Sequence, residues 1–330
     1  IINTLGERRV FAALALATML LCAVGVFIDV AVITVAPIAL SIGKRLGLSP
    51  SVLLIAMIGG GKCGNIVSPN PNTIIAAENF KADLSSVMFY NVLPAIVGLL
   101  FTVFVILRLI PKKLTTVGVA QEAIEDDKEL PSLASSLVAP FVTIILLALR
   151  PLTGITIDPL IALPIGGICG ILCMKQWRNI LPSMEYGLQK MSTVAVLLIG
   201  TGTVAGVIKN STLKDWILQL LEQAHFNEIM IAPVSGALMS AATASTTAGA
   251  TLASASFAEA ILAVGISAAW GAAMINSSAT VLDHLPHGSF FHATGGVCEL
   301  TFKQRLKLIP YETLIGAVLA ASTTLLCLLW

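Results

Sequence analysis

Long apolar runs dominate this sequence and limit the folds it can adopt. A helix that crosses a bilayer needs roughly 20 apolar residues, and runs of about this kind cover residues 9–27, 87–110, 136–150, 157–174, 191–208 and 309–329. Hydrophobic residues fill 56% of the 330 positions and charged residues only 11%, whereas soluble domains have about 25% charged residues. Because a soluble protein has too little interior for this much apolar surface, the sequence predicts an all-α polytopic membrane protein embedded in a lipid bilayer.

The charge balance and the cysteines exclude several other classes. The net charge is +1, so nothing points to a nucleic-acid partner. The six cysteines lie mostly inside apolar runs and lack histidines at ligand spacing. We therefore expect no metal, disulfide or cofactor.

A weak internal repeat is found when the chain is shifted on itself by 217 positions. The Met-Ile pair at 57–58 then falls on the Met-Ile pair at 274–275. Each pair opens a polar stretch that we expect to be non-helical, GGGKCGNIVSPNPN at 59–72 and NSSATVLDHLPHGS at 276–289. This pattern predicts a transporter built from two inverted structural repeats, with re-entrant hairpins and broken helices.

The repeat also suggests how the chain is divided. We expect a first repeat at 1–110, a polar linker at 111–135 rich in acidic and basic residues, and a second repeat at 136–330. Residue 1 falls on residue 218, so 136–217 has no counterpart in the first half. If the two halves are equal in length, we expect on the order of 80 further residues before Ile1.

The segment GGGKCG formally matches a nucleotide-binding pattern but lacks its context. No strand precedes it, and Lys62 is followed by Cys63 where a phosphate-binding loop needs Ser or Thr. We instead expect a broken helix at membrane depth, where glycines allow close approach, asparagines supply donors and acceptors, and prolines interrupt the helix. The N-terminus of the half-helix that follows suits a carboxylate. An ordinary extramembrane loop is the alternative.

The candidate substrate-binding residues come from three polar stretches. Lys62 either attracts an anionic substrate or extends to the membrane interface. The small-residue run 242–256 either packs helices or binds a ligand through its hydroxyls. The predicted set is Lys62, Gly64, Asn65, Ser68, Asn70, Asn72, Thr73, Ser245, Thr246, Thr247, Asn276 and Ser277.

Three residues are candidates for proton coupling. Asp29 is an isolated acid in an apolar run, which costs about 2.5–3.5 kcal/mol on insertion scales. His284 and His287 are candidates because histidine is the side-chain type suited to relaying protons. The alternatives are an acid at a helix end beside water for Asp29, and a metal site or structural hydrogen bonding for the histidines, although Pro286 breaks any helix between them.

Several of these segments together resemble the gluconate permease (GntP-type) family of bacterial proton symporters, within the larger ion-transporter fold group. HLPHGSFF from His284, followed at matching distance by a Glu-Thr pair at 312–313, is similar to the family's C-terminal motif. TTAG at 246–249 and VFIDVAVITVAP at 26–37 resemble two further family segments. The resemblance implies a multi-pass protein of the bacterial inner membrane and a homodimer with inverted repeats. It also implies functional roles for Asp29, Thr246, Thr247 and His284.

The sequence departs from the family in two places. KCGNIVSPNPNT at 62–73 replaces a histidine-rich, proline-rich segment, and His287 and Phe291 replace the Asp and Trp of the C-terminal motif. These departures leave the substrate and the coupling ion open.

The sequence predicts a secondary transporter, not an enzyme. We expect it to import an organic anion, either a gluconate-like sugar acid or another small carboxylate, together with protons. A Na⁺-coupled carboxylate carrier and a channel are alternatives. An intramembrane hydrolase is a weaker one, since the chain has no G-x-S-x-G motif.

Overall fold

The computed structural model describes residues 7–110, 159–186 and 228–330, together with isolated positions between 132 and 219. Every regular element in these residues is a helix, which confirms the all-α class. The chain forms two compact units, one made of residues 1–115 with 198–330 and the other of residues 116–197. Within the second unit, α10 (Pro159–Cys173) is followed by a short 3₁₀ turn at Trp177–Asn179. Most of the expected linker at 111–135 and of the expected spans 136–150 and 191–208 lies outside the described residues.

The first unit contains two series of helices in the same order. The first series is α1 (Glu7–Ala23), α2 (Ile28–Leu46), α3 (Pro50–Asn65), α4 (Pro71–Phe80), α5 (Leu84–Tyr90), α6 (Val92–Phe101), the π-helical turn η2 (Thr102–Ile106) and α7 (Leu107–Leu109). The second is η4 (Glu228–Met230), α13 (Ile231–Thr243), α14 (Thr246–Ala263), α15 (Ala268–Ser278), α16 (Ser289–Val297), α17 (Phe302–Leu306) and α18 (Ile309–Leu329).

The starts of these helices repeat at a nearly constant spacing. Helices α2, α3, α4 and α5 each begin 218 positions before α14, α15, α16 and α17, and α6 begins 217 positions before α18. Left-handed backbone repeats in the same way, at Gly47 and Gly265 and at Lys81 and Glu299. The spacing agrees to within one residue with the offset in the sequence.

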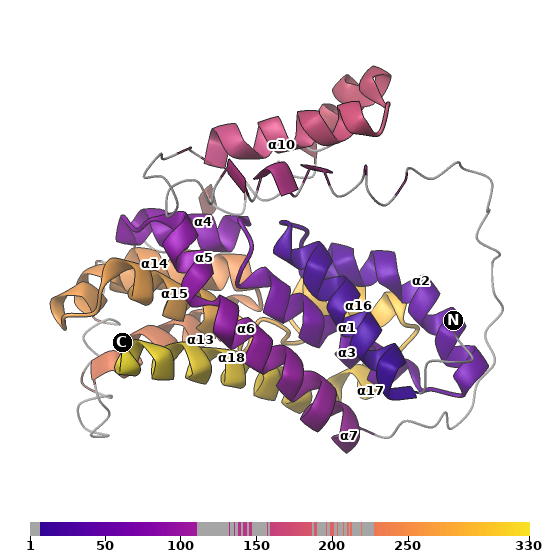
Figure 1. The fold of residues 1–330 in the computed structure, drawn as a ribbon. Helices are drawn as coiled ribbons and strands as arrows, with labels where there is room; N and C mark the ends of the chain where they lie inside the picture. Colours follow the sequence, from indigo (N-terminus) through magenta and orange to yellow (C-terminus); the bar gives the residue numbers. More distant parts are fainter. Residues whose placement is uncertain are drawn as a thin grey trace. The chain divides into compact units, whose positions relative to one another are not determined.

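The contacts between the two series are reciprocal. Helix α4 packs against α14 and α15, and α16 packs against α2. Helix α18 packs against both α6 and α15 (Figure 1). Helix α4, which follows α3, and helix α16, which follows α15, therefore each touch the other series. The two series are interleaved.

Among the residues that the structure describes, two stretches are long and apolar enough to cross a membrane. Leu84–Leu109 spans α5 to α7 and contains an 18-residue window with a mean hydropathy of 2.5, and Phe302–Leu329 spans α17 and α18 and contains one with a mean hydropathy of 1.8. They occupy corresponding places in the two series. Their length and composition agree with a membrane protein.

The expectation of a non-helical stretch over 59–72 is wrong in its first half. Helix α3 continues through the glycines to Asn65, and the interruption covers only residues 66–70. Pro69 and Pro71 favour this break, since proline lacks a backbone N–H. The side chain of Asn70 caps α4 by accepting from the backbone N–H of Thr73 at 3.4 Å. The stretch from 276 is likewise helical up to Ser278, and its interruption covers 279–288.

The glycines of α3 serve helix packing. A Cβ atom on Gly60 would lie 1.8 Å from the carbonyl oxygen of Ala15, and one on Gly64 would lie 2.1 Å from that of Met19. Both glycines therefore face the backbone of α1, in the small-xxx-small spacing that lets membrane helices approach closely. The structure thus gives them a partner within the chain, where the sequence pattern favours a ligand.

Candidate functional site

The two interruptions meet through a buried cluster of charged and polar side chains. Lys62, on the last turn of α3, reaches residues of the 279–288 interruption. Its Nζ lies 2.6 Å from Asp283 Oδ1 and 3.1 Å from His284 Nδ1, and it also donates to the carbonyl oxygen of Thr280. Residues more than 200 positions apart thus form one site, which we call the Lys62 cluster: Lys62, Thr246, Thr280, Asp283, His284 and Thr313.

Asp283 uses both carboxylate oxygens within this cluster. Oδ1 accepts from Lys62 and lies 3.1 Å from His284 Nδ1, while Oδ2 accepts from Thr246 Oγ1 at 2.6 Å. Thr246 is the first residue of α14, which Ser245 caps by accepting from the backbone N–H of Ala248. The start of α14 is thereby tied to the interrupted helix α15–α16.

Burial makes this ion pair energetically demanding. The Lys62 side chain is 0% exposed and that of Asp283 is 3% exposed. Ions removed from water cost several kcal/mol each unless a partner and further hydrogen bonds compensate them. Lys62 has all three of its donors matched by acceptors, and Asp283 has both oxygens matched by donors. The opposite charges of Lys62 and Asp283 cancel, and the hydrogen bonds compensate for the water that both side chains have lost.

The partners of His284 assign its tautomer. Its Nε2 lies 3.1 Å from the carbonyl oxygen of Ile309 and 3.1 Å from Thr313 Oγ1. A carbonyl oxygen only accepts, so Nε2 carries the proton in the neutral ring. Nδ1 is then an acceptor and receives a hydrogen bond from Lys62. A second proton on the ring makes Nδ1 a donor, so that it can donate to Asp283 and can no longer accept from Lys62.

A second polar network, of neutral side chains, joins the end of α3, the first interruption and α4 to α15. Asn276 of α15 donates to the carbonyl oxygen of Ile66 at 3.1 Å and to Thr73 Oγ1 at 3.1 Å, and it accepts from Asn72 at 2.7 Å. Asn276 thus connects the first interruption to α4 and to the second series. The network is buried throughout.

Asn65 is the residue of this network with a free donor. Its Oδ1 accepts from Asn70 Nδ2, and its backbone carbonyl accepts from Ser68 Oγ at 2.9 Å. Within the residues that the structure describes, Asn65 Nδ2 and Ser256 Oγ are the buried side-chain atoms without a hydrogen-bond partner.

Most of the predicted binding residues lie in or beside these two networks. Lys62, Asn65, Ser68, Asn70, Asn72, Thr73, Thr246 and Asn276 belong to them through the hydrogen bonds described above, and Ser245 caps the helix that begins at Thr246. Ser277 is buried, but its hydroxyl donates to its own helix, at Met274 O. Thr247 is buried on the second residue of α14, and Gly64 packs against α1.

Two of the three predicted proton-coupling residues lie apart from the cluster. Asp29 is half-buried in the first turn of α2, where its Oδ1 accepts from the backbone N–H of Val30 at 2.9 Å. His287 is exposed. Of the three, His284 is the one that contacts the buried ion pair.

Three members of the cluster, Asp283, Thr280 and Thr313, are not among the residues predicted from the sequence. Asp283 is visible as a charge in an apolar region, but its partner Lys62 is 221 positions away. Buried charges are usually paired, so the lysine and the acid in corresponding polar stretches are a signal that could have found it.

A second buried ion pair was also missed. Arg305 (1% exposed) donates to both carboxylate oxygens of Glu312 (0% exposed), to Thr294 Oγ1 at 3.3 Å and to the carbonyl oxygen of Phe291 at 3.3 Å. Its guanidinium also lies 4.8 Å from the centre of the Phe291 ring. Because Glu312 precedes Thr313, this pair holds the start of α18 beside His284.

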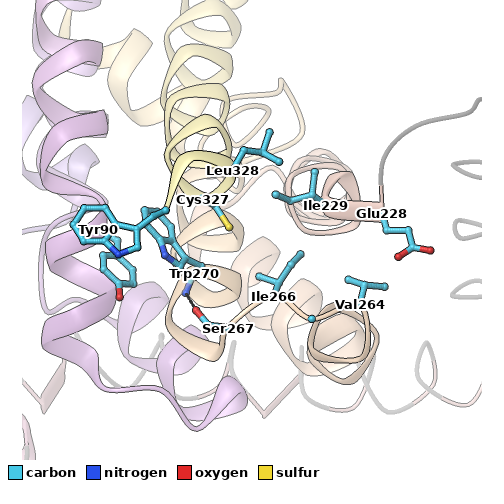
Figure 2. Close-up of a pocket in the computed structure, with 11 residues that line it drawn as sticks. Tyr90, Glu228, Ile229, Val264, Ile266, Ser267, Trp270, Cys327 and Leu328 are labelled. Atoms are coloured by element: carbon cyan, nitrogen blue, oxygen red, sulfur yellow. Dashed lines mark hydrogen bonds between the residues drawn. The ribbon is translucent and has the colours of Figure 1, made fainter.

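A cavity of about 500 Å³ lies apart from both networks. Figure 2 shows its walls, which come from Tyr90, from the loop and start of α15 around Ser267 and Trp270, from Glu228 and from the end of α18. Tyr90 and Trp270 stack at 4.1 Å. No residue of the Lys62 cluster lines this cavity, and the buried ionic chemistry makes the cluster the stronger candidate for the functional site.

Comparisons with known proteins place this chain among transporters. A family model for GntP family permeases matches residues 1–330. An uncharacterized transporter of Haemophilus influenzae is 53% identical over 99% of this chain and 78% of its own length. The D-serine transporter DsdX of Escherichia coli is 25% identical over 68% of this chain, and the match spans 56% of DsdX.

The family match covers both interrupted helices and the cluster between them. The relative at 53% identity and the one at 25% identity are both named as transporters. The chain therefore belongs to the GntP family of permeases and is a membrane transporter rather than an enzyme.

Proposed function

We propose that this chain carries a small organic anion, together with protons, across the bacterial inner membrane. The observation that carries the proposal is the Lys62 cluster, where a buried cation, a buried acid and a histidine share their hydrogen bonds. A lysine matches a substrate carboxylate, and a histidine is the side chain that exchanges protons near neutral pH.

The coupling step is an exchange of partners around Asp283. With His284 neutral, Lys62 donates to both His284 and Asp283. When His284 takes a second proton, its Nδ1–H donates to Asp283, and one Lys62 donor loses its acceptor. The cluster then has a net positive charge and a free ammonium N–H, and a substrate carboxylate supplies both the missing charge and the missing acceptor.

Charge balance sets the direction in which the membrane potential acts. One proton with one monoanion moves no net charge. Each additional proton adds about 2.3 kcal/mol of driving force per 100 mV when the inside is negative. We propose His284 as one proton site, and Asp29 and His287 stay as predicted further ones.

We also propose that the two helix series are inverted repeats. Support comes from the helix starts 218 positions apart and from the reciprocal contacts of α4 with α14 and of α16 with α2. In this proposal α1–α2 and α13–α14, which are joined by short turns, are the re-entrant hairpins, and α3–α4 and α15–α16 are the broken helices. The expected homodimer remains a prediction from the family.

Uptake by proteoliposomes tests the proposal. With an outside-acidic pH gradient, the full-length protein should accumulate a labelled sugar acid or small carboxylate, and sodium should be dispensable. His284→Gln should abolish accumulation, whereas His292→Gln should preserve it, since His292 is exposed and hydrogen-bonds Pro286 O. Uptake that requires sodium at fixed pH would support the Na⁺-coupled alternative, and equilibration without accumulation would indicate a channel.

A further inference from the structure

We infer that Asn65 selects the substrate by donating its free amide N–H to an oxygen on the carbon next to the substrate carboxylate. The site would therefore take 2-hydroxy acids in preference to 2-amino acids. This inference rests on the proposed transport of a carboxylate at the Lys62 cluster, and it adds a specificity-determining residue and a substrate class to it.

The orientation of the Asn65 amide is fixed by its neighbours. Asn65 Oδ1 accepts from Asn70 Nδ2, while Asn70 Oδ1 accepts from Thr73 Oγ1 at 3.0 Å and from Thr73 N. A flipped Asn65 amide would place two NH₂ groups against each other. Asn65 Nδ2 therefore points away from Asn70, buried and without an acceptor.

An unsatisfied buried donor is unusual in a network that is otherwise matched. Most buried polar side-chain atoms have a partner, and each exception needs an explanation. Here the neighbouring amides of Asn70, Asn72 and Asn276 all donate to oxygen atoms. A ligand oxygen is the missing partner that a transport site would supply.

The position of Asn65 relates this donor to the proposed carboxylate site. Asn65 follows Lys62 by three positions on α3, and residues at this spacing are neighbours on one helix face. Asn65 is also the last residue of α3, directly before the first interruption, and lies 218 positions before Asp283 in the second. One compact ligand can therefore contact both the Lys62 ammonium and the Asn65 amide.

The chemistry of the two donors decides between substrates of equal size. A hydroxyl oxygen accepts a hydrogen bond, whereas an ammonium group has no acceptor. An ammonium at this position would leave Asn65 unsatisfied and would face the Lys62 charge. The oxygens of Asp283, which could otherwise receive it, already accept from Lys62 and Thr246 and contact His284.

The test compares three ligands of matched size with the purified full-length chain by titration calorimetry. D-glycerate and D-serine differ only in the group on carbon 2, a hydroxyl or an ammonium, and 3-hydroxypropionate has hydrogen there. We expect wild type to bind D-glycerate at least ~10-fold more tightly than either of the others. This comparison needs no substitution and is independent of variant folding.

Substitution of Asn65 provides the second arm. Asn65→Asp replaces the donor by an acceptor of the same shape. It should remove the preference for D-glycerate over 3-hydroxypropionate. It should also reduce or reverse the preference for D-glycerate over D-serine. Ser256→Ala is the matched control, because Ser256 Oγ is also buried and unpartnered but lies ten positions along α14 from Thr246. It should keep the wild-type order.

Two results would overturn the inference. One is equal affinity of wild type for D-glycerate and 3-hydroxypropionate, or tighter binding of D-serine. The other is an Asn65→Asp protein that binds with the wild-type order. Failure of proton coupling is distinct, because it would appear as a wild-type preference for D-glycerate in binding without accumulation in a pH gradient.

Discussion

Removal of either member of the Lys62–Asp283 pair should destabilise the protein strongly. Lys62→Met leaves a buried carboxylate without its cation, and Asp283→Asn leaves a buried ammonium without its anion. Both side chains are at most 3% exposed, and their charged atoms are 2.6 Å apart. Breaking a buried pair of this kind by removing one partner costs about 3–5 kcal/mol.

The double substitution should cost less than the two single ones together. Lys62→Met combined with Asp283→Asn removes both charges, so no unpaired ion remains, and neutral replacements of buried pairs are often tolerated. We expect a coupling free energy of at least ~1 kcal/mol between the two sites. Lys303→Met is the matched control, because Lys303 is exposed on α17 and should change stability by less than ~0.5 kcal/mol.

Thermal unfolding of the detergent-purified proteins measures these effects. For domains of 150–250 residues, each kcal/mol shifts the melting temperature by about 2–4 °C, so each single substitution should lower it by roughly 10 °C. The reasoning would be refuted if both single variants melted like Lys303→Met. It would also be refuted if the double variant lost the full sum of the two single effects.

Three further substitutions test separate contacts. Gly64→Leu should prevent close packing of α1 on α3, because its Cβ would lie 2.1 Å from Met19 O. The melting temperature should fall by a shift equivalent to ~1–3 kcal/mol or more, and an unchanged melting temperature would contradict this. Arg305→Met should cost about 3–5 kcal/mol by leaving Glu312 buried and unpaired, and unchanged melting would show that the pair is dispensable. Thr246→Val should cost about 1.5–3 kcal/mol by removing a donor to the Asp283 carboxylate. Thr246→Ser keeps the hydroxyl and should have close to wild-type stability. A serine variant as unstable as the valine variant would exclude the hydrogen bond as the cause.

Composition and spacing predict much of this fold. The apolar runs identify the membrane class because no soluble interior is large enough for them. The offset of 217 in the sequence anticipates the spacing of the helix starts, since corresponding helices can begin with the same capping signal, as at Ser49 before α3 and Ser267 before α15. It also marks the two segments that contain the cluster.

Local pattern fails where contacts between distant helices decide the structure. The glycines at 59–61 look like a loop, but α3 stays helical there because α1 packs directly onto it. Asp29 looks like a mid-helix acid, but α1 ends at Ala23 and a new helix begins at Ile28. Asp283 gains its significance from Lys62, and no local feature of either segment specifies that contact.

Protons taken up on substrate binding test the central claim most directly. The heat of D-glycerate binding, measured near neutral pH in two buffers with different ionisation enthalpies, gives this number for wild type and for His284→Gln. If protonation of His284 frees Lys62 for the carboxylate, wild type should take up a proton fraction approaching about one per ligand, and His284→Gln clearly less. Binding without proton uptake in wild type, or with equal uptake in the variant, would contradict the account.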